Sequence, residues 1–137
     1  MAGRPNGEPS LEDVQRAAAF RVALRAFQRG TERVARGAGL TPQWYLLLLL
    51  VKGSENGAEQ ATVGELAKRM QLAQSSVTEL VNRAERAGLV RRTASTFDGR
   101  VAYIALTTEG EERFAASFRA LAEERGALRQ AVARLSR

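Results

Sequence analysis

Apolar residues recur at three- and four-residue intervals over most of this chain, which is the spacing of amphipathic helices. The pattern predicts a long helix over residues 10–36, a second over 42–52, a short third over 63–70 and a fourth over 73–87. Residues 53–61, which are rich in glycine and polar side chains, are expected to form a loop. The first two thirds of the chain are therefore predicted to be mainly helical.

Capping residues indicate where these helices begin and end. Ser10 and Thr41 precede the first two helices, and a proline follows Thr41 at the first helical position. Thr62 and Glu65 have the spacing of a capping box, which predicts the start of the third helix. Gly88 is expected to end the fourth helix in a left-handed conformation, which glycine adopts without strain.

Beyond Gly88 the alternation of apolar and polar residues changes to a period of two. Two short strands are predicted at about residues 89–94 and 100–106, and they are joined through an Asp98–Gly99 turn. Thr108 and Glu111 are expected to cap a C-terminal helical region. The predicted fold class is mainly α with a small β-hairpin.

The C-terminal region carries a heptad seam that is interrupted only by Arg125. It forms either one continuous helix or two helices broken at Arg125–Gly126. The apolar seam must be buried against another helix, either of the same chain or of a second copy. Two amphipathic terminal helices around a central lobe favour a two-fold homodimer. The residues expected at the dimer interface are Leu11, Val14, Phe114, Phe118, Leu121, Leu128, Val132 and Leu135.

The composition narrows the classes of function. The 137 residues carry a net charge of +6, which is compatible with a nucleic-acid partner but does not establish one. Cysteine and histidine are absent, which excludes disulfides, thiol-based oxidant sensing, Cys/His zinc sites and nucleophile pairs that use histidine. Because the carboxylates are scattered and no glycine-rich phosphate loop is present, we expect no enzymatic activity, no catalytic residues, no metal and no cofactor.

The ends of the chain and its apolar runs carry no sign of membrane targeting. Residues 1–9 are polar and rich in glycine and proline, which predicts a flexible arm and not a secretory signal. The apolar run over residues 44–51 is far shorter than the ~20 residues that cross a bilayer. We therefore expect a cytoplasmic protein with no membrane partner.

The helix over 73–87 followed by a basic hairpin is the order that a winged helix-turn-helix needs to place one helix in a major groove of double-stranded DNA. Small polar side chains on the outer helix face allow close approach to bases; Gln74 suits adenine, and Arg100 at the wing suits a minor groove. Asp98 is either a simple turn residue or holds Arg100. The candidate DNA-binding residues are Gln74, Ser75, Ser76, Thr78, Asn82, Arg83, Arg91, Arg92, Thr96, Asp98 and Arg100.

Other interpretations of these residues stay open. A solvated helix face is also polar, so no single residue of the set identifies a DNA contact. A winged-helix adaptor that binds proteins would carry a basic face only incidentally. An architectural DNA binder would contact phosphates without reading sequence.

Several motifs together resemble the MarR family of bacterial winged-helix regulators. They are LTPQW at residues 40–44, VGELAKRM at 63–70, QSSVTELVNRAERAGLVRR at 74–92, DGR at 98–100 and IALTTEG at 104–110. The resemblance implies one domain over residues 10–137, with 10–40 and 108–137 as dimerisation helices and 41–107 as the DNA-binding lobe. It also implies a homodimer, a recognition helix at 73–87, wing contact through Arg100, and transcriptional repression of nearby genes that a small aromatic or amphipathic ligand relieves.

The chain departs from the family pattern at the start of the recognition helix, where Ala73 replaces the usual capping serine or threonine. The candidate residues for an effector site are Phe20, Arg21, Phe27, Trp44 and Tyr45. An arginine beside aromatic rings suits an aromatic carboxylate. Because aromatic residues at helical spacing are more often core than pocket, packing is the favoured role for these rings.

Overall fold

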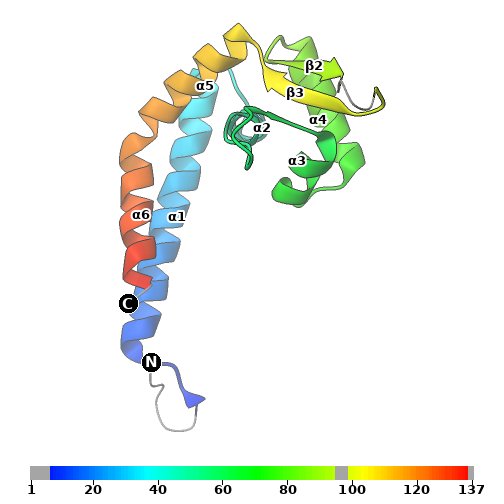
Figure 1. Ribbon diagram of the computed structural model, residues 1–137. Coiled ribbons are helices and arrows are strands. Elements are labelled where there is room, and N and C mark those ends of the chain that lie inside the picture. Colours follow the sequence, from blue (N-terminus) through cyan, green and yellow to red (C-terminus); the bar gives the residue numbers. More distant parts are fainter. Residues whose placement is uncertain (1–6, 95–98, 136–137) are drawn as a thin grey trace. The chain divides into compact units, whose positions relative to one another are not determined.

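The computed structural model describes residues 7–94 and 99–135 (Figure 1). The chain divides into two compact units. The helical unit comprises Met1–Val34 and Phe118–Arg137, and the winged unit comprises Ala35–Ser117. Helix α1 (Leu11–Gly37) and helix α5 (Thr108–Ala120) each contribute residues to both units.

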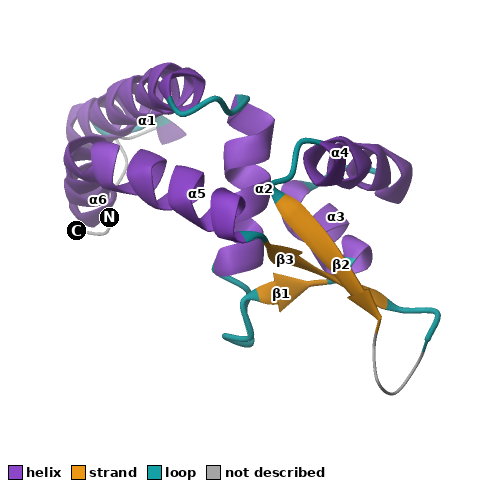
Figure 2. Ribbon diagram, turned by 90° about the horizontal axis from the view of Figure 1, so that it is seen from above, coloured by secondary structure: helices purple, strands orange, loops and turns teal. Residues whose placement is uncertain are grey.

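The described residues of the winged unit form three complete helices and three strands, and the helices come in the order that the sequence predicts. They are α2 (Pro42–Lys52), β1 (Gln60–Ala61), α3 (Val63–Met70), α4 (Gln74–Arg86), β2 (Val90–Ala94) and β3 (Ala102–Leu106). Figure 2 shows β3 between β1 and β2. Both pairings are antiparallel, and β2 faces β3 in the register Arg92 to Ile104.

Strand β1 corrects the prediction that residues 53–61 form only a loop. Gln60 pairs with Ala105 and Ala61 pairs with Ile104. Two residues are too few to show a period of two, and their extended conformation depends on pairing with a strand that lies far along the chain. The structure therefore adds a third strand to the predicted hairpin.

The core of the winged unit lies where the helices meet β3. Leu47, Leu48 and Val51 of α2 are fully buried, as are Leu66 of α3 and Ile104 of β3. Burial of each such side chain contributes about 1.5–3 kcal/mol relative to exposure to water. This shared core holds α3 and α4 together as a helix-turn-helix.

The observed caps agree with the prediction at three helices and differ at α5. Backbone N–H groups donate to the side chains of Ser10, Thr41 and Thr62, and the capping box of α3 is complete. Gly88 follows α4 with φ +79°, in the left-handed region. For α5 the prediction was one residue off, because Thr107 and not Thr108 accepts the N–H of Gly110, at 3.0 Å.

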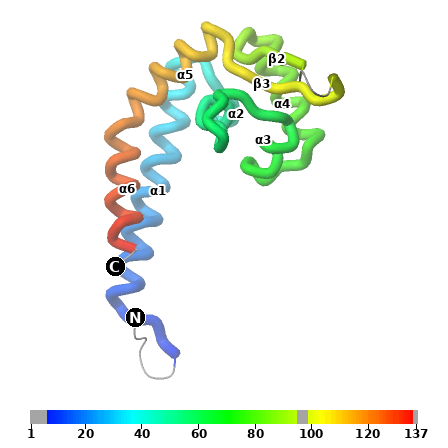
Figure 3. Tube along the Cα trace, viewed as in Figure 1, coloured from blue at the N-terminus to red at the C-terminus, as the bar shows by residue number. Residues whose placement is uncertain are grey.

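The helical unit pairs α1 with α6 (Ala122–Leu135), and Figure 3 shows the two helices side by side. The C-terminal region breaks at Leu121, between α5 and α6, and not at Arg125–Gly126. The guanidinium of Arg125 donates to the carbonyl of Phe118 at 2.6 Å and lies 3.6 Å from the centre of its ring. Arg125 thus provides a hydrogen-bond donor for a carbonyl near the end of α5, and its own backbone is part of helix α6.

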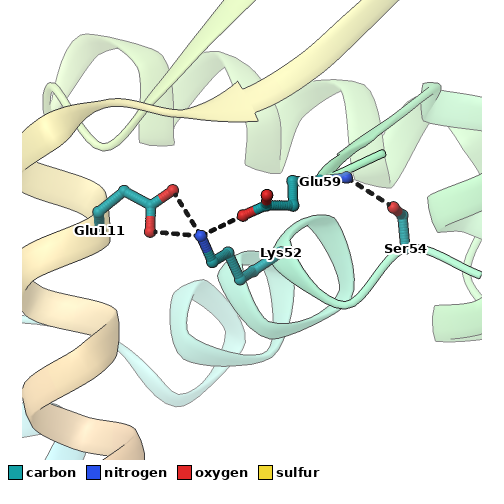
Figure 4. A network of polar contacts seen from close by, with 4 residues as sticks. All are labelled: Lys52, Ser54, Glu59 and Glu111. Carbon is teal, nitrogen blue, oxygen red and sulfur yellow. Dashed lines mark hydrogen bonds and ion pairs between the residues drawn. The ribbon is translucent and has the colours of Figure 1, made fainter. Parts of the chain in front are cut away.

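A charged network connects three segments of the winged unit (Figure 4). The ammonium of Lys52, at the end of α2, pairs with Glu59 in the segment before β1 and, at 3.0 Å, with Glu111 of α5. The hydrogen bond to Glu59 and, to a smaller extent, the one to Glu111 raise the pKa of Lys52 above its ordinary value. Because all three side chains are partly exposed, the network contributes little energy and mainly orients the segments.

Among residues 7–94 and 99–135, no helix is both long and apolar enough to span a membrane. In the same residues, no three acidic side chains lie close enough to bind a metal ion.

Two helical glycines provide a matched test of the packing between α5 and the chain that enters β2. A Cβ at Gly110 would overlap the carbonyl oxygen of Leu89, whereas a Cβ at Gly126 in α6 would meet nothing within 4 Å. Gly110→Ala should lower the free energy of unfolding by about 1–3 kcal/mol through overpacking. Gly126→Ala should raise it by about 0.5–1 kcal/mol, because alanine favours the helix. Urea denaturation measures both, and shifts of the same sign would contradict this packing.

Candidate nucleic-acid interface

Helix α4 has one buried side and one exposed side. Val77, Leu80, Val81 and Ala84 are buried in the core of the winged unit, as the sequence predicts. Because a helix has 3.6 residues per turn, the side chains between them point to solvent. The exposed polar residues in the first half of α4 are Gln74, Ser75, Ser76, Thr78 and Glu79, and those in the second half are Arg83, Glu85 and Arg86.

The first four of these exposed residues have no side-chain partner in the described part of the chain. Gln74, Ser75, Ser76 and Thr78 make no side-chain hydrogen bond with any residue that the structure describes. Short hydroxyl and amide side chains on an accessible helix can approach base edges closely, and both donors and acceptors are available. This face can therefore read nucleic-acid bases.

The start of α4 lacks the side-chain cap that the other helices of the winged unit have. Ala73 adopts the extended conformation of a capping residue, with φ −64° and ψ 147°, but its methyl group accepts no hydrogen bond. The first N–H groups of α4 are left without a side-chain acceptor.

Arg83 is positioned by its own helix. Its guanidinium pairs with the carboxylate of Glu79, one turn earlier, at 2.5 Å. Both side chains are largely exposed, so the pair contributes only about 0.3–0.5 kcal/mol. A phosphate or a guanine edge can therefore compete for Arg83 at low energetic cost.

Arg92 and Asn82 were both predicted to face DNA, but the structure joins them to each other. The guanidinium of Arg92, on β2, donates to Asn82 Oδ1 at 2.6 Å and to Glu85 Oε1 at 3.3 Å. Successive strand residues point to opposite sides of a sheet, so Arg92 is directed to α4 and the exposed Arg91 to the other side. The sequence spacing alone did not show this, because the contact depends on how β2 leaves α4.

The wing is described only in part. Arg100 follows Gly99 and is exposed in the turn that precedes β3. Two further candidates, Thr96 and Asp98, lie outside the described residues. Arg91, Arg92 and Arg100 are all exposed on the wing, but Arg92 is held by Asn82 and Glu85.

The predicted dimer residues divide into two groups. Leu11, Val14, Phe118, Val132 and Leu135 are exposed in the helical unit, and Leu128 is half-buried. Phe114 and Leu121 are instead buried inside the chain, which corrects the prediction for these two. The seam does not stay on one surface because the break at Leu121 interrupts the helix that would carry it.

Tyr45 takes the packing role that the sequence favours, whereas the exposure of Val22 was not anticipated. Tyr45 is buried and stacks on Phe114, with ring centroids 5.8 Å apart, so it is a core residue and not an accessible ligand-site residue. Val22 on α1 is 70% exposed although the predicted interface did not include it.

The remaining effector candidates lie in different units. Trp44 is half-buried in the winged unit, whereas Phe20 and Phe27 are half-buried and Arg21 is exposed in the helical unit. Arg21 lines a shallow groove of about 530 Å³ on α1, together with Arg25 and Arg29.

Comparison with known proteins relates this geometry to a family. Residues 38–101, which contain the helix-turn-helix and the start of the wing, match the sequence model of the MarR family. Over this segment, which is just under half of its length, the chain is similar to the MarR family. The predicted fold class, a mainly α winged helix-turn-helix, is confirmed by solved structures of MarR-type regulators. One of them is AbsC from Streptomyces coelicolor, which is 24% identical. The comparison covers 84% of this chain and 76% of AbsC, with a TM-score of 0.64.

Other relatives extend the comparison. The transcriptional repressor MdtR of Bacillus subtilis (strain 168) is 37% identical over 76 residues, or 56% of this chain and 46% of MdtR. The match thus spans less than half the length of that curated relative. YusO from Bacillus subtilis is 26% identical over 83% of this chain and 77% of its own, with a TM-score of 0.63. AbfR in its reduced form bound to DNA is 26% identical over 77% and 74%, with a TM-score of 0.59.

The missing cap of α4 generates a prediction. Ala73→Ser would place a hydroxyl where it can accept an N–H of the first turn, which should raise the free energy of unfolding by about 1 kcal/mol. Hydrogen exchange should slow in the first turn of α4. Thr62→Ala, which removes the existing cap of α3, is the matched control and should destabilise by a similar amount. If Thr62→Ala destabilises the protein but Ala73→Ser does not stabilise it, the missing cap does not lower the stability of α4.

Proposed function

We propose that this chain is a sequence-specific transcriptional regulator that binds double-stranded DNA as a homodimer. The observation that carries the proposal is the exposed face of α4. Four buried apolar residues anchor the helix, and on the opposite side Gln74, Ser75, Ser76 and Thr78 make no side-chain hydrogen bond with any described residue. A helix that is held rigidly from behind and is polar in front meets the requirement for reading a major groove.

In this proposal the face of α4 reads bases and the arginines around it bind phosphates. Gln74 pairs with an adenine, and Ser75, Ser76 and Thr78 contact base edges or thymine methyl groups. Arg83 leaves Glu79 for a phosphate or a guanine. Arg91 contacts the backbone, and Arg100 enters the adjacent minor groove. The DNA-bound structure of AbfR, which has this fold, supports such a role for the winged unit.

The dimer follows from the exposed apolar residues of the helical unit. Leu11 is 58% exposed and Val14 is 47% exposed on α1, and Leu135 is 40% exposed on α6. A second copy would cover this surface by two-fold symmetry, because the same patch is present on both subunits. Two α4 helices would then enter successive major grooves of a palindromic operator, about 34 Å apart.

Repression of nearby genes is the favoured outcome of binding. MdtR, which shares 37% identity over 76 residues, is a transcriptional repressor. A small aromatic or amphipathic effector would relieve repression only if it binds more tightly to the form that cannot hold DNA. Since Tyr45 is in the core, the effector candidates that stay are Phe20, Arg21 and Phe27 in the helical unit and, separately, Trp44 in the winged unit.

Selection from a library of random duplexes tests the proposal. The purified protein should enrich a two-fold-symmetric motif, and binding should weaken as salt rises. Retention without enrichment would indicate an architectural binder, because phosphate contacts carry no sequence information. No retention at either of two salt concentrations would indicate a protein-binding adaptor. Arg100→Ala should lower affinity for the enriched motif by about 1–3 kcal/mol.

Light scattering tests the dimer separately. Val14→Glu combined with Leu135→Glu would place carboxylates in the apolar interface, and the molar mass at micromolar concentration should fall from that of a dimer to that of a monomer. Leu72→Glu is the control, because Leu72 is an equally exposed apolar residue of the winged unit. A monomeric wild-type protein, or a mass that the double substitution leaves unchanged, would remove this interface.

A further inference from the structure

Arg92 makes a second connection between α4 and the wing. Beyond the turn at Gly88, its guanidinium reaches back ten residues to Asn82 and seven residues to Glu85. We refer to Arg92, Asn82 and Glu85 as the Arg92 clamp. Arginine only donates hydrogen bonds, so the amide of Asn82 must present its oxygen, and both partners act as acceptors.

The clamp acts across a turn that has little stiffness of its own. After α4, the N–H groups of Gly88 and Leu89 bond to the carbonyls of Glu85 and Ala84, and β2 begins at Val90. Gly88 has φ +79°, where a glycine has more freedom than other residues. The planar guanidinium, held by two acceptors on successive turns of α4, fixes the direction in which β2 leaves the helix.

Charge gives the clamp a second effect. Glu85 is a partly exposed carboxylate on the helix that would lie in the major groove. Without a cation beside it, this carboxylate would repel DNA phosphates. Arg92 neutralises it at 3.3 Å, so its charge is already engaged before any DNA arrives.

We propose that Arg92 is a positioning residue, and not a phosphate contact: through Asn82 and Glu85 it holds the wing at a fixed angle to the recognition helix. The inference rests on the proposed function and deepens it. It assigns DNA contact in β2 to Arg91 and removes Arg92 and Asn82 from the reading surface. The angle between α4 and the wing is then set before binding. The entropy cost of ordering the wing when DNA binds is therefore smaller.

The first test uses the full-length protein without DNA. Hydrogen exchange in β2 and in the last turn of α4 should become faster in Arg92→Gln and in Glu85→Gln. Arg91→Gln is the matched control, because Arg91 is the adjacent, exposed arginine of the same strand and should leave exchange unchanged. Unchanged exchange in both clamp variants would overturn the proposal.

The second test uses the sign of an affinity change. If Arg92 bound phosphate, Glu85→Gln would release it and strengthen binding to the enriched duplex. The clamp predicts the opposite, a loss of roughly fivefold to tenfold, because a charged hydrogen bond that orients the wing is gone. Glu112→Gln, an exposed carboxylate of α5, controls for the change in net charge. Stronger binding by Glu85→Gln than by Glu112→Gln would overturn the proposal.

The salt dependence and a charge swap complete the design. Arg92→Gln should weaken binding with the slope of log affinity against log salt unchanged, whereas a lost phosphate contact would reduce the slope by about 0.9. Arg92→Glu alone should bind poorly. Arg92→Glu with Glu85→Arg should recover part of the affinity, because the ion pair is restored with reversed polarity and the Asn82 amide can then donate; no recovery would contradict the clamp.

These results separate the clamp from the proposed function. If wild-type protein binds an operator but the clamp variants do not show the predicted changes in exchange and affinity, only the proposal of the clamp is wrong. If wild-type protein retains no duplex, the proposed function fails, and the role of the clamp in DNA binding fails with it. Hydrogen exchange in the free protein then still decides whether Arg92 fixes the wing.

Discussion

The burial of one side of α4 is the constraint on which the rest of the interface depends. Val77 and Val81 have no exposed surface, and Leu80 and Ala84 complete the same side of the helix. A rotation of α4 by one residue, about 100°, would expose these side chains and bury serine and threonine hydroxyls without partners. The helix therefore has one orientation, and its polar residues are presented at the surface as a consequence of packing behind them.

The charges around α4 are arranged in pairs and not as a uniform basic surface. Glu79 holds Arg83 and Glu85 holds Arg92, so two of the arginines near the helix are oriented by carboxylates of the same helix. Such exposed pairs contribute little stability, but they reduce the number of conformations that each long side chain explores. A net charge of +6 attracts any DNA, whatever its sequence. The carboxylates beside these arginines weaken such non-specific attraction.

The helical unit shows how a break in a helix changes which surface is apolar. The heptad seam of the C-terminal region passes through Phe114, Phe118 and Leu121, but only Phe118 stays exposed. Phe114 stacks on Tyr45 in the winged unit, and Leu121 is buried against α1 beside Gly30. The exposed remainder of the seam, together with Leu11 and Val14, forms the surface that a second copy would cover.

The sequence by itself determined the first four helices, the caps of the first three, the two faces of α4 and the family motifs, because these depend on residues that are close along the chain. Thr62 and Glu65 are three residues apart, and the apolar side of α4 repeats within a few turns. Only the tertiary structure decided that residues 60–61 form a strand, that Tyr45 packs on Phe114, and that Arg92 binds Asn82 and Glu85. Each of these contacts joins residues that the chain separates, and their meeting depends on how whole elements pack, which no local pattern encodes.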